Sequence, residues 1–199
     1  MPPVEPSADP NAELMLRVRQ GDESAFDLLV EKFKTPVFNY VCRTIGNEDE
    51  AEDIAQNVFI QVYKSAERYE PTAKFTTWLF TIARNLCLNE FRRRKRHSLQ
   101  SLDETFSSDP ESGPTQLADP SARPPAVEAS ERELRRHILA AIEKLPEDQR
   151  TAVLLCRYEG LSYEEVARVL GASVAATKSI LHRARQTLKE ELHKFLRET

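Results

Sequence analysis

Two groups of residues in this chain have the types and spacing that nucleic-acid binding uses. One lies near the C-terminus and consists of Lys178, Ser179, His182, Arg183 and Arg185. The other is a run of Arg92, Arg93, Arg94, Lys95 and Arg96, preceded by the aromatic residues Tyr69, Phe75 and Trp78. Lysine and arginine neutralise phosphates, arginine can also form a bidentate pair with guanine, and aromatic rings stack on unpaired bases. The chain as a whole is acidic, with 28 Lys and Arg against 32 Asp and Glu, so both groups are local concentrations of positive charge.

A helix-turn-helix pattern positions the C-terminal group. Ser162 followed three residues later by Glu165 is a capping box, which predicts that a helix begins directly after the serine. Gly171 is the residue type that commonly closes a helix, and Ser173 can cap a second helix over about 174–196. The second helix of such a pair lies in the DNA major groove. A charged helical hairpin without any role in DNA binding is the alternative interpretation.

Apolar residues at helical spacing predict a bundle of helices in the N-terminal half. The first helix is expected over Ala12–Gln20 and the second over about Phe26–Phe33. Thr35 and Pro36 are expected to restart the chain, because proline is favoured in a first helical turn. A further helix is expected over about Glu48–Glu67, and the next one ends in the arginine run. The aromatic residues before that run could stack on bases or belong to the core, and the core is favoured for Trp78.

The opening turns of the helix expected from residue 48 are strongly acidic. They contain Glu48, Asp49, Glu50, Glu52 and Asp53. Negative charge suits the N-terminus of a helix, which is the simplest explanation. Five carboxylates in six positions exceed what the helix dipole needs, so a basic protein partner is the competing explanation.

Composition separates the two helical parts. Residues 99–128 hold six acidic residues against one arginine, and five of the chain's 12 prolines fall between Pro110 and Pro125. This composition predicts a disordered linker over 98–129, and four prolines in the first ten residues predict a disordered N-terminus over 1–11. A second capping box, Ser130 with Glu133, is expected to open the C-terminal domain.

Other classes of protein receive no support from the sequence. No apolar run approaches the roughly 18 residues of a membrane span, and the N-terminus has no signal region, so a cytoplasmic protein without membrane insertion is expected. Cys42, Cys87 and Cys156 are isolated in apolar helical settings and are expected to be buried thiols. The four histidines lack metal-ligand spacing, and no phosphate loop or nucleophile motif is found. We therefore expect no enzymatic activity, no metal and no cofactor.

Four motifs in a fixed order resemble the bacterial extracytoplasmic-function sigma factors of the sigma-70 family. They are EAEDIAQNVF (50–59), FTTWLFTIARN (75–85), LPEDQR (145–150) and YEGLSYEEVARVLGASVAATKSILHRAR (158–185). The resemblance implies an all-α fold with two small helical domains. These are a region 2 bundle over 12–97 and a region 4 helix-turn-helix domain over 130–199, joined by the linker.

The resemblance also implies partners and residue roles. RNA polymerase core would be bound through the β′ clamp helices by region 2 and through the β flap by region 4, and promoter DNA and an anti-sigma factor are further implied partners. The residues implied for the clamp helices are Glu50, Glu52, Asp53, Gln56 and Phe59. Those implied for the −10 element are Tyr69, Lys74, Phe75, Trp78, Asn85, Arg92, Arg93 and Arg94. Those implied for the −35 element are Lys178, Ser179, His182, Arg183 and Arg185.

Three positions depart from the family pattern, because the family often has Thr, Val and Arg where this chain has Ala176, Thr177 and Ile180. The exact −35 sequence is therefore not implied. Two other functions stay open on the residues alone. One is a helix-turn-helix transcriptional regulator that does not associate with core polymerase, and the other is a protein that occupies polymerase without reading DNA. The linker is expected either to thread through polymerase channels or to act as a passive tether.

Overall fold

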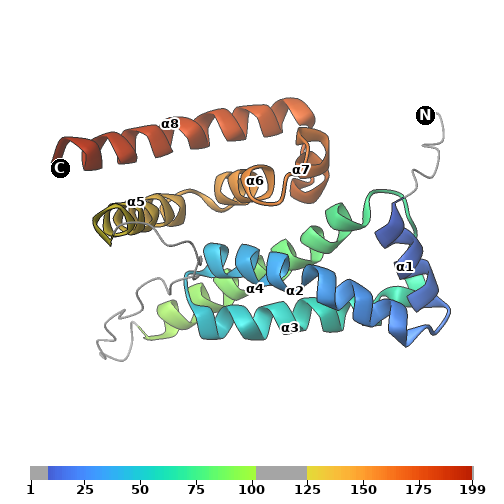
Figure 1. Ribbon diagram of the computed structural model, residues 1–199. Coiled ribbons are helices and arrows are strands. Elements are labelled where there is room, and N and C mark those ends of the chain that lie inside the picture. The colour runs from blue at the N-terminus through green and yellow to red at the C-terminus, as the bar shows by residue number, and fades with distance from the viewer. Residues whose placement is uncertain (1–8, 102–124, 199) are drawn as a thin grey trace.

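The computed structural model describes the backbone of residues 9–101 and 125–198, and side chains over 9–97 and 132–194. All regular structure in these ranges is helical (Figure 1), which confirms the all-α expectation. The N-terminal part contains α1 (Pro10–Arg19), α2 (Glu23–Ile45), α3 (Glu48–Lys64), the short 3₁₀ helix η1 (Ala66–Arg68) and α4 (Phe75–Ser101). The C-terminal part contains α5 (Pro125–Glu143), α6 (Glu147–Arg157), α7 (Tyr163–Leu170) and α8 (Val174–Glu198).

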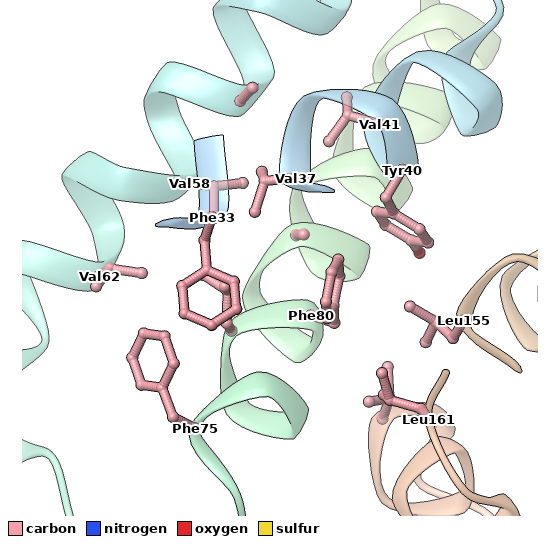
Figure 2. Packing of buried hydrophobic residues seen from close by; sticks show 14 of the residues in the cluster. Phe33, Val37, Tyr40, Val41, Val58, Val62, Phe75, Phe80, Leu155 and Leu161 are labelled. Carbon is pink, nitrogen blue, oxygen red and sulfur yellow. The ribbon is translucent and has the colours of Figure 1, made fainter. Parts of the chain in front are cut away.

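Helices α2, α3 and α4 lie side by side and form the N-terminal bundle (Figure 1). Asp22 and Asn47 cap α2 and α3, since their side chains accept from the amides of Ala25 and Glu50. Valines of α2 and α3 and aromatic rings of α4 fill the space between them (Figure 2). The apolar stripes that the sequence shows are therefore the faces that these helices bury.

The predicted restart of the chain at Thr35 and Pro36 is wrong, because α2 runs through Pro36 without a break. Proline has no N–H and removes one hydrogen bond from a helix interior. Phe33 and Val37, on either side, are both buried in the core. Packing of one continuous apolar stripe thus holds the helix together across a residue that ordinarily interrupts one.

The ends of three helices also differ from the sequence expectation. Helix α1 begins at Pro10 with Asp9 as its cap, two residues before the expected start. Helix α4 continues to Ser101 and α5 begins at Pro125, so helix extends into both ends of the expected linker. Ser130 consequently lies inside α5, and the predicted capping box does not open this helix. Residues 1–8 and 102–124, which hold most of the segments expected to be disordered, lie outside the described residues.

The helix-turn-helix forms as its local chemistry predicts. The Glu165 amide donates to Ser162 Oγ over 3.2 Å, and the Ser162 amide donates to Glu165 Oε2 over 2.7 Å. Gly171 ends α7 with a φ of 66°, a backbone conformation that side chains other than glycine's disfavour. The hydroxyl of Ser173 then accepts from the Ala176 amide and caps α8. Both helix starts and the turn between them are confirmed.

The two parts share one hydrophobic core. Tyr40 of α2 and Phe80 of α4 face Leu155 of α6 and Leu161, which precedes α7 (Figure 2). All four side chains are buried. The Tyr40 hydroxyl lies 3.4 Å from Thr151 Oγ1 of α6. The helix-turn-helix is therefore packed against the N-terminal bundle in this structure.

Polar contacts surround that shared core. Arg84 of α4 pairs with Asp148 at 2.7 Å, and Lys74, just before α4, pairs with Glu165 of α7 at 2.9 Å. Arg150 of α6 donates to the Thr44 carbonyl near the end of α2, over 2.5 Å. Its guanidinium also donates to the Glu143 and Leu145 carbonyls at the end of α5 and packs over the ring of Phe91. One arginine thus satisfies carbonyls at two helix ends, that of Thr44 in the N-terminal bundle and those of Glu143 and Leu145 in its own domain.

Candidate nucleic-acid and protein interfaces

Helix α8 has one buried face and one exposed basic face. Thr177, Leu181 and Ala184 are buried against the rest of the helix-turn-helix. The residues expected to read DNA are exposed on the other side, and they are Lys178, Ser179, His182, Arg183 and Arg185. Such a face, at the start of the second helix of a helix-turn-helix, has the geometry that major-groove readers use.

The exposed side chains of α8 differ in how they are held. Ser179 donates to the Ala175 carbonyl, and Arg183 donates to the Ser179 carbonyl over a long 3.4 Å, so among the described residues both are held by bonds within α8. Arg185 donates to the Tyr163 hydroxyl of α7 over 3.0 Å. Arg183 can therefore leave its contact at small cost, whereas Arg185 is tied to the neighbouring helix.

The three departures from the family pattern lie in different surroundings. Thr177 is fully buried and its hydroxyl donates to the Ser173 carbonyl. Ile180 is half-buried and packs against the core. Only Ala176 is exposed among the three. Ala176 is therefore the departure that lies on the exposed face of α8.

The loop over residues 69–74, between η1 and α4, contains the first of the aromatic residues. Tyr69 is 2% exposed and Phe75 is 1% exposed, and the two rings pack on Trp78 with centroid separations of 4.9 Å and 5.8 Å. Burial raises the pKa of Tyr69 to about 12. Trp78 is half-buried and packs against the core, so the expectation that it is a core residue is met in part. The rings of Tyr69 and Phe75 therefore pack into the core at the two ends of the loop and do not face solvent.

The basic residues of α4 divide into exposed and internally paired groups. Arg92 is exposed and donates only to Asn89, over 3.2 Å, among the described residues. Arg93 makes two bonds to Glu90, of 2.8 and 3.0 Å. Arg94 pairs with Glu50 of α3 and donates to the Ile45 carbonyl at the end of α2. Arg94 thus joins three helices, and sequence reasoning gave no indication of this internal role.

Helix α3 presents an exposed face that is acidic at one end and apolar at the other. Glu52, Asp53 and Gln56 are exposed, and Phe59 is half-buried. Glu50 forms an ion pair with Arg94. Ile60 and Tyr63 continue the same face at 48% and 50% exposure. Sequence reasoning missed these two, although their spacing of four and seven residues from Gln56 places them on one side of a helix. Exposed apolar side chains beside carboxylates are typical of a protein interface.

The cysteines and histidines form no site in the part of the chain with described side chains. Cys87 is buried, Cys42 and Cys156 are half-buried, and burial raises the pKa of all three thiols. Within the described ranges no three His, Cys, Asp or Glu side chains are grouped to hold a metal ion. None of the helices described there contains the long apolar stretch that a membrane span requires.

The two halves of the chain match two parts of one family. Residues 29–97 match the family described as Sigma-70 region 2, and residues 135–188 match Sigma-70, region 4. The RNA polymerase sigma-H factor of Pseudomonas aeruginosa is 35% identical over 94% of this chain and 95% of its own length. The chain belongs to the extracytoplasmic-function sigma factors. The sigma-E factor of Escherichia coli K12, at 34% identity over 92% of this chain and 95% of its own, is a further relative.

Solved structures of sigma factors share this fold. The sigma factor RpoE of Bartonella quintana, solved in complex with the anti-sigma factor NepR, superposes with a TM-score of 0.67. It is 26% identical, over 84% of this chain and 96% of that one. CnrH in complex with the cytosolic domain of CnrY gives the same TM-score at 24% identity and shows the shared fold. As a sigma factor the protein is a transcription initiation factor, and a regulator acting apart from polymerase is not supported.

Proposed function

We propose that this sigma factor binds RNA polymerase core, reads the −10 element with region 2 and reads the −35 element with α8. The observation that carries this proposal is that one chain presents both the exposed basic face of α8 and the acidic and apolar face of α3. Run-off transcription with purified core enzyme on a library of promoters tests it. The proposal predicts transcripts from a subset that shares two sequence elements, and transcription without any shared element contradicts it.

The α3 face is the proposed site for the β′ clamp helices. Glu52, Asp53 and Gln56 supply charge and hydrogen bonds, and Ile60 and Tyr63 supply apolar area. An interface with a central apolar part and polar surroundings is the common anatomy of protein complexes. Region 4 is proposed to contact the β flap. Because polymerase is a cytoplasmic enzyme, the factor is proposed to act in the cytoplasm.

The 69–74 loop and the exposed part of α4 form the proposed site for the unpaired −10 strand. Lys74, Asn85 and Arg92 are exposed and can reach phosphates and base edges, and Trp78 offers a partly exposed ring. The buried rings of Tyr69 and Phe75 anchor the two ends of the loop in the core. An unpaired base that leaves the duplex needs a formed pocket with positive charge beside it, which this arrangement can supply.

The −35 element is the proposed partner of α8. Arg183 is the strongest candidate for a base reader, because its planar group can bond guanine O6 and N7 together. Lys178 and Arg185 are suited to phosphates, while Ser179 and His182 lie on the same exposed face.

The packed arrangement of the two domains is proposed to open at a promoter. The ion pair between Lys74 and Glu165 places the loop of region 2 against the helix-turn-helix. The −10 and −35 elements are about 25 base pairs apart, or roughly 85 Å of duplex at 3.4 Å per base pair. Adjacent domains cannot contact both elements across that length. We call the arrangement in which the two domains are packed together the closed arrangement. An anti-sigma factor, such as the one bound to the Bartonella relative, is a proposed partner of the closed arrangement.

A further inference from the structure

Helix α1 contacts both ends of the 69–74 loop. At one end, Arg19 Nη1 donates to the Tyr69 carbonyl over 3.3 Å. At the other end, the Phe75 amide donates to Asp9 Oδ2 over 2.8 Å. Asp9 caps α1 and Arg19 is its last residue, so the two contacts come from opposite ends of the same helix. Figure 1 shows α1 beside the segment that leads into α4.

One carboxylate serves two helix starts. Oδ1 of Asp9 accepts from the Asn11 amide over 3.0 Å and caps α1, while Oδ2 accepts from the first amide of α4. The first amides of a helix have no partner within the helix, and a negative charge there is favourable. Asp9 therefore fixes the point at which the loop ends and α4 begins.

The helix that carries these contacts is itself firmly held. Met15 is fully buried, and Ala12 and Val18 are buried beside it, which attaches α1 to the bundle through its apolar face. The loop, in contrast, has one backbone bond of its own, from the Thr72 amide to the Glu70 carbonyl. Its middle residues Glu70, Pro71 and Thr72 are exposed. The loop is thus fixed at its ends and open in the middle.

We propose that Asp9 and Arg19 are positioning residues, which hold the 69–74 loop in the shape that receives an unpaired base of the −10 element. This inference rests on the proposed reading of the −10 element by region 2. Both residues precede the matched region 2 segment, which begins at residue 29. A loop held before binding loses less conformational freedom when the base enters, so the base binds more tightly.

Asp22→Ala is the matched control for Asp9→Ala. Asp22 caps α2 in the same bundle, pairs with Arg17 and makes no contact with the loop among the described residues. Each replacement removes one helix cap of the same type, so both should lower thermal stability. Only the Asp9 replacement removes a contact to the start of α4. Asp9→Asn keeps an oxygen acceptor without the charge. It should therefore retain part of the base preference that Asp9→Ala loses.

The experiment uses the full chain with core polymerase and single-stranded −10 oligonucleotides that differ at one base. We expect the parent's preference for its best base to fall roughly tenfold, equivalent to about 1.4 kcal/mol, in Asp9→Ala and in Arg19→Ala. Asp22→Ala should retain the parent's preference. Amide hydrogen exchange over residues 69–75 should accelerate in the first two variants and not in the control.

The outcomes separate the two proposals. If the parent discriminates between bases and Asp9→Ala and Arg19→Ala discriminate equally well, the positioning role is overturned while reading of the −10 element stands. If Asp22→Ala loses the preference as strongly, the effect belongs to general stability and the positioning role is again overturned. If the parent itself shows no base preference on single strands, the proposed −10 reading fails, and the inference fails with it.

Discussion

Arg150 of α6 donates a hydrogen bond to the carbonyl of Thr44, 106 residues earlier in the chain, over 2.5 Å. The same guanidinium satisfies carbonyls at the end of α5, so it joins the helix ends of two domains. Together with the ion pairs of Lys74 and Arg84, it connects the two domains.

Arg150→Met should favour the open arrangement. Methionine is shorter and uncharged, so the Thr44 carbonyl loses its donor from the other domain, at a cost on the order of 2–3 kcal/mol. Small-angle scattering should show a larger radius of gyration, and promoter DNA should bind the isolated factor more tightly. Arg157→Met, an exposed change in the same helix, should alter neither. An unchanged radius in Arg150→Met would show that the apolar contacts and the ion pairs of Lys74 and Arg84 keep the domains together without Arg150.

Reversing two charges on α3 should weaken binding to core polymerase. Glu52→Lys with Asp53→Lys should reduce affinity at least about tenfold and leave helicity intact, because exposed carboxylates contribute little to stability. The control is Glu13→Lys with Asp27→Lys, which makes the same change of charge at exposed sites on α1 and α2. A binding titration with labelled core enzyme measures the difference. Equal affinity for the two double variants would place the clamp contact elsewhere.

Arg92 and Arg94 should respond differently to replacement by alanine. Arg92→Ala should lower the salt dependence of −10 strand binding by about 0.7 in slope, with thermal stability unchanged, since Arg92 is exposed. Arg94→Ala should lower stability by about 1–2 kcal/mol, because Ile45, Glu50 and Glu90 lose their shared partner. Thermal unfolding and salt titrations measure the two effects. A reversal of the pattern would mean that Arg94 leaves its internal contacts to bind DNA.

Arg183→Ala should relax the −35 base preference at one position. It should also reduce the free energy of binding to the preferred −35 sequence by roughly 1–3 kcal/mol. The helix should survive, since alanine is a good helix former and Arg183 is exposed. If Lys178 binds a phosphate, Lys178→Ala should instead weaken binding to all −35 sequences by the same factor. Selection of −35 sequences by each variant separates the two behaviours. Recovery of the parent's preference at every position by Arg183→Ala would rule out a base contact.

Local chemistry made the helix-turn-helix predictable. The capping box of Ser162 and Glu165, the glycine at 171 and the cap at Ser173 all act within a few residues, so the printed sequence contains the whole interaction. The break expected at Pro36 was wrong for the opposite reason. Burial of its neighbours depends on helices that lie far away in the chain, and packing outweighed the local preference.

The candidate sites were predictable by residue type and less so by role. Arginine serves equally for a phosphate and for the end of a helix, and only its distant neighbours show which applies. Arg94 has such a neighbour in Glu50, 44 residues away, and Arg92 has none among the described residues. Tyr69 and Phe75 have the side chains that stacking needs, but the fold directs both into the core. The same limit hid Asp9, whose second contact lies 66 residues along the chain.

The order of synthesis gives the bond between Thr44 and Arg150 a further consequence. A ribosome adds roughly 5–20 residues each second, so about 5–20 s pass between the appearance of these two residues. In the last part of that interval, after α4 is complete at Ser101, Tyr40 and Phe80 still lack the cover of Leu155 and Leu161 (Figure 2). An N-terminal bundle that folds during synthesis is therefore expected to expose these two rings until the second domain has been made.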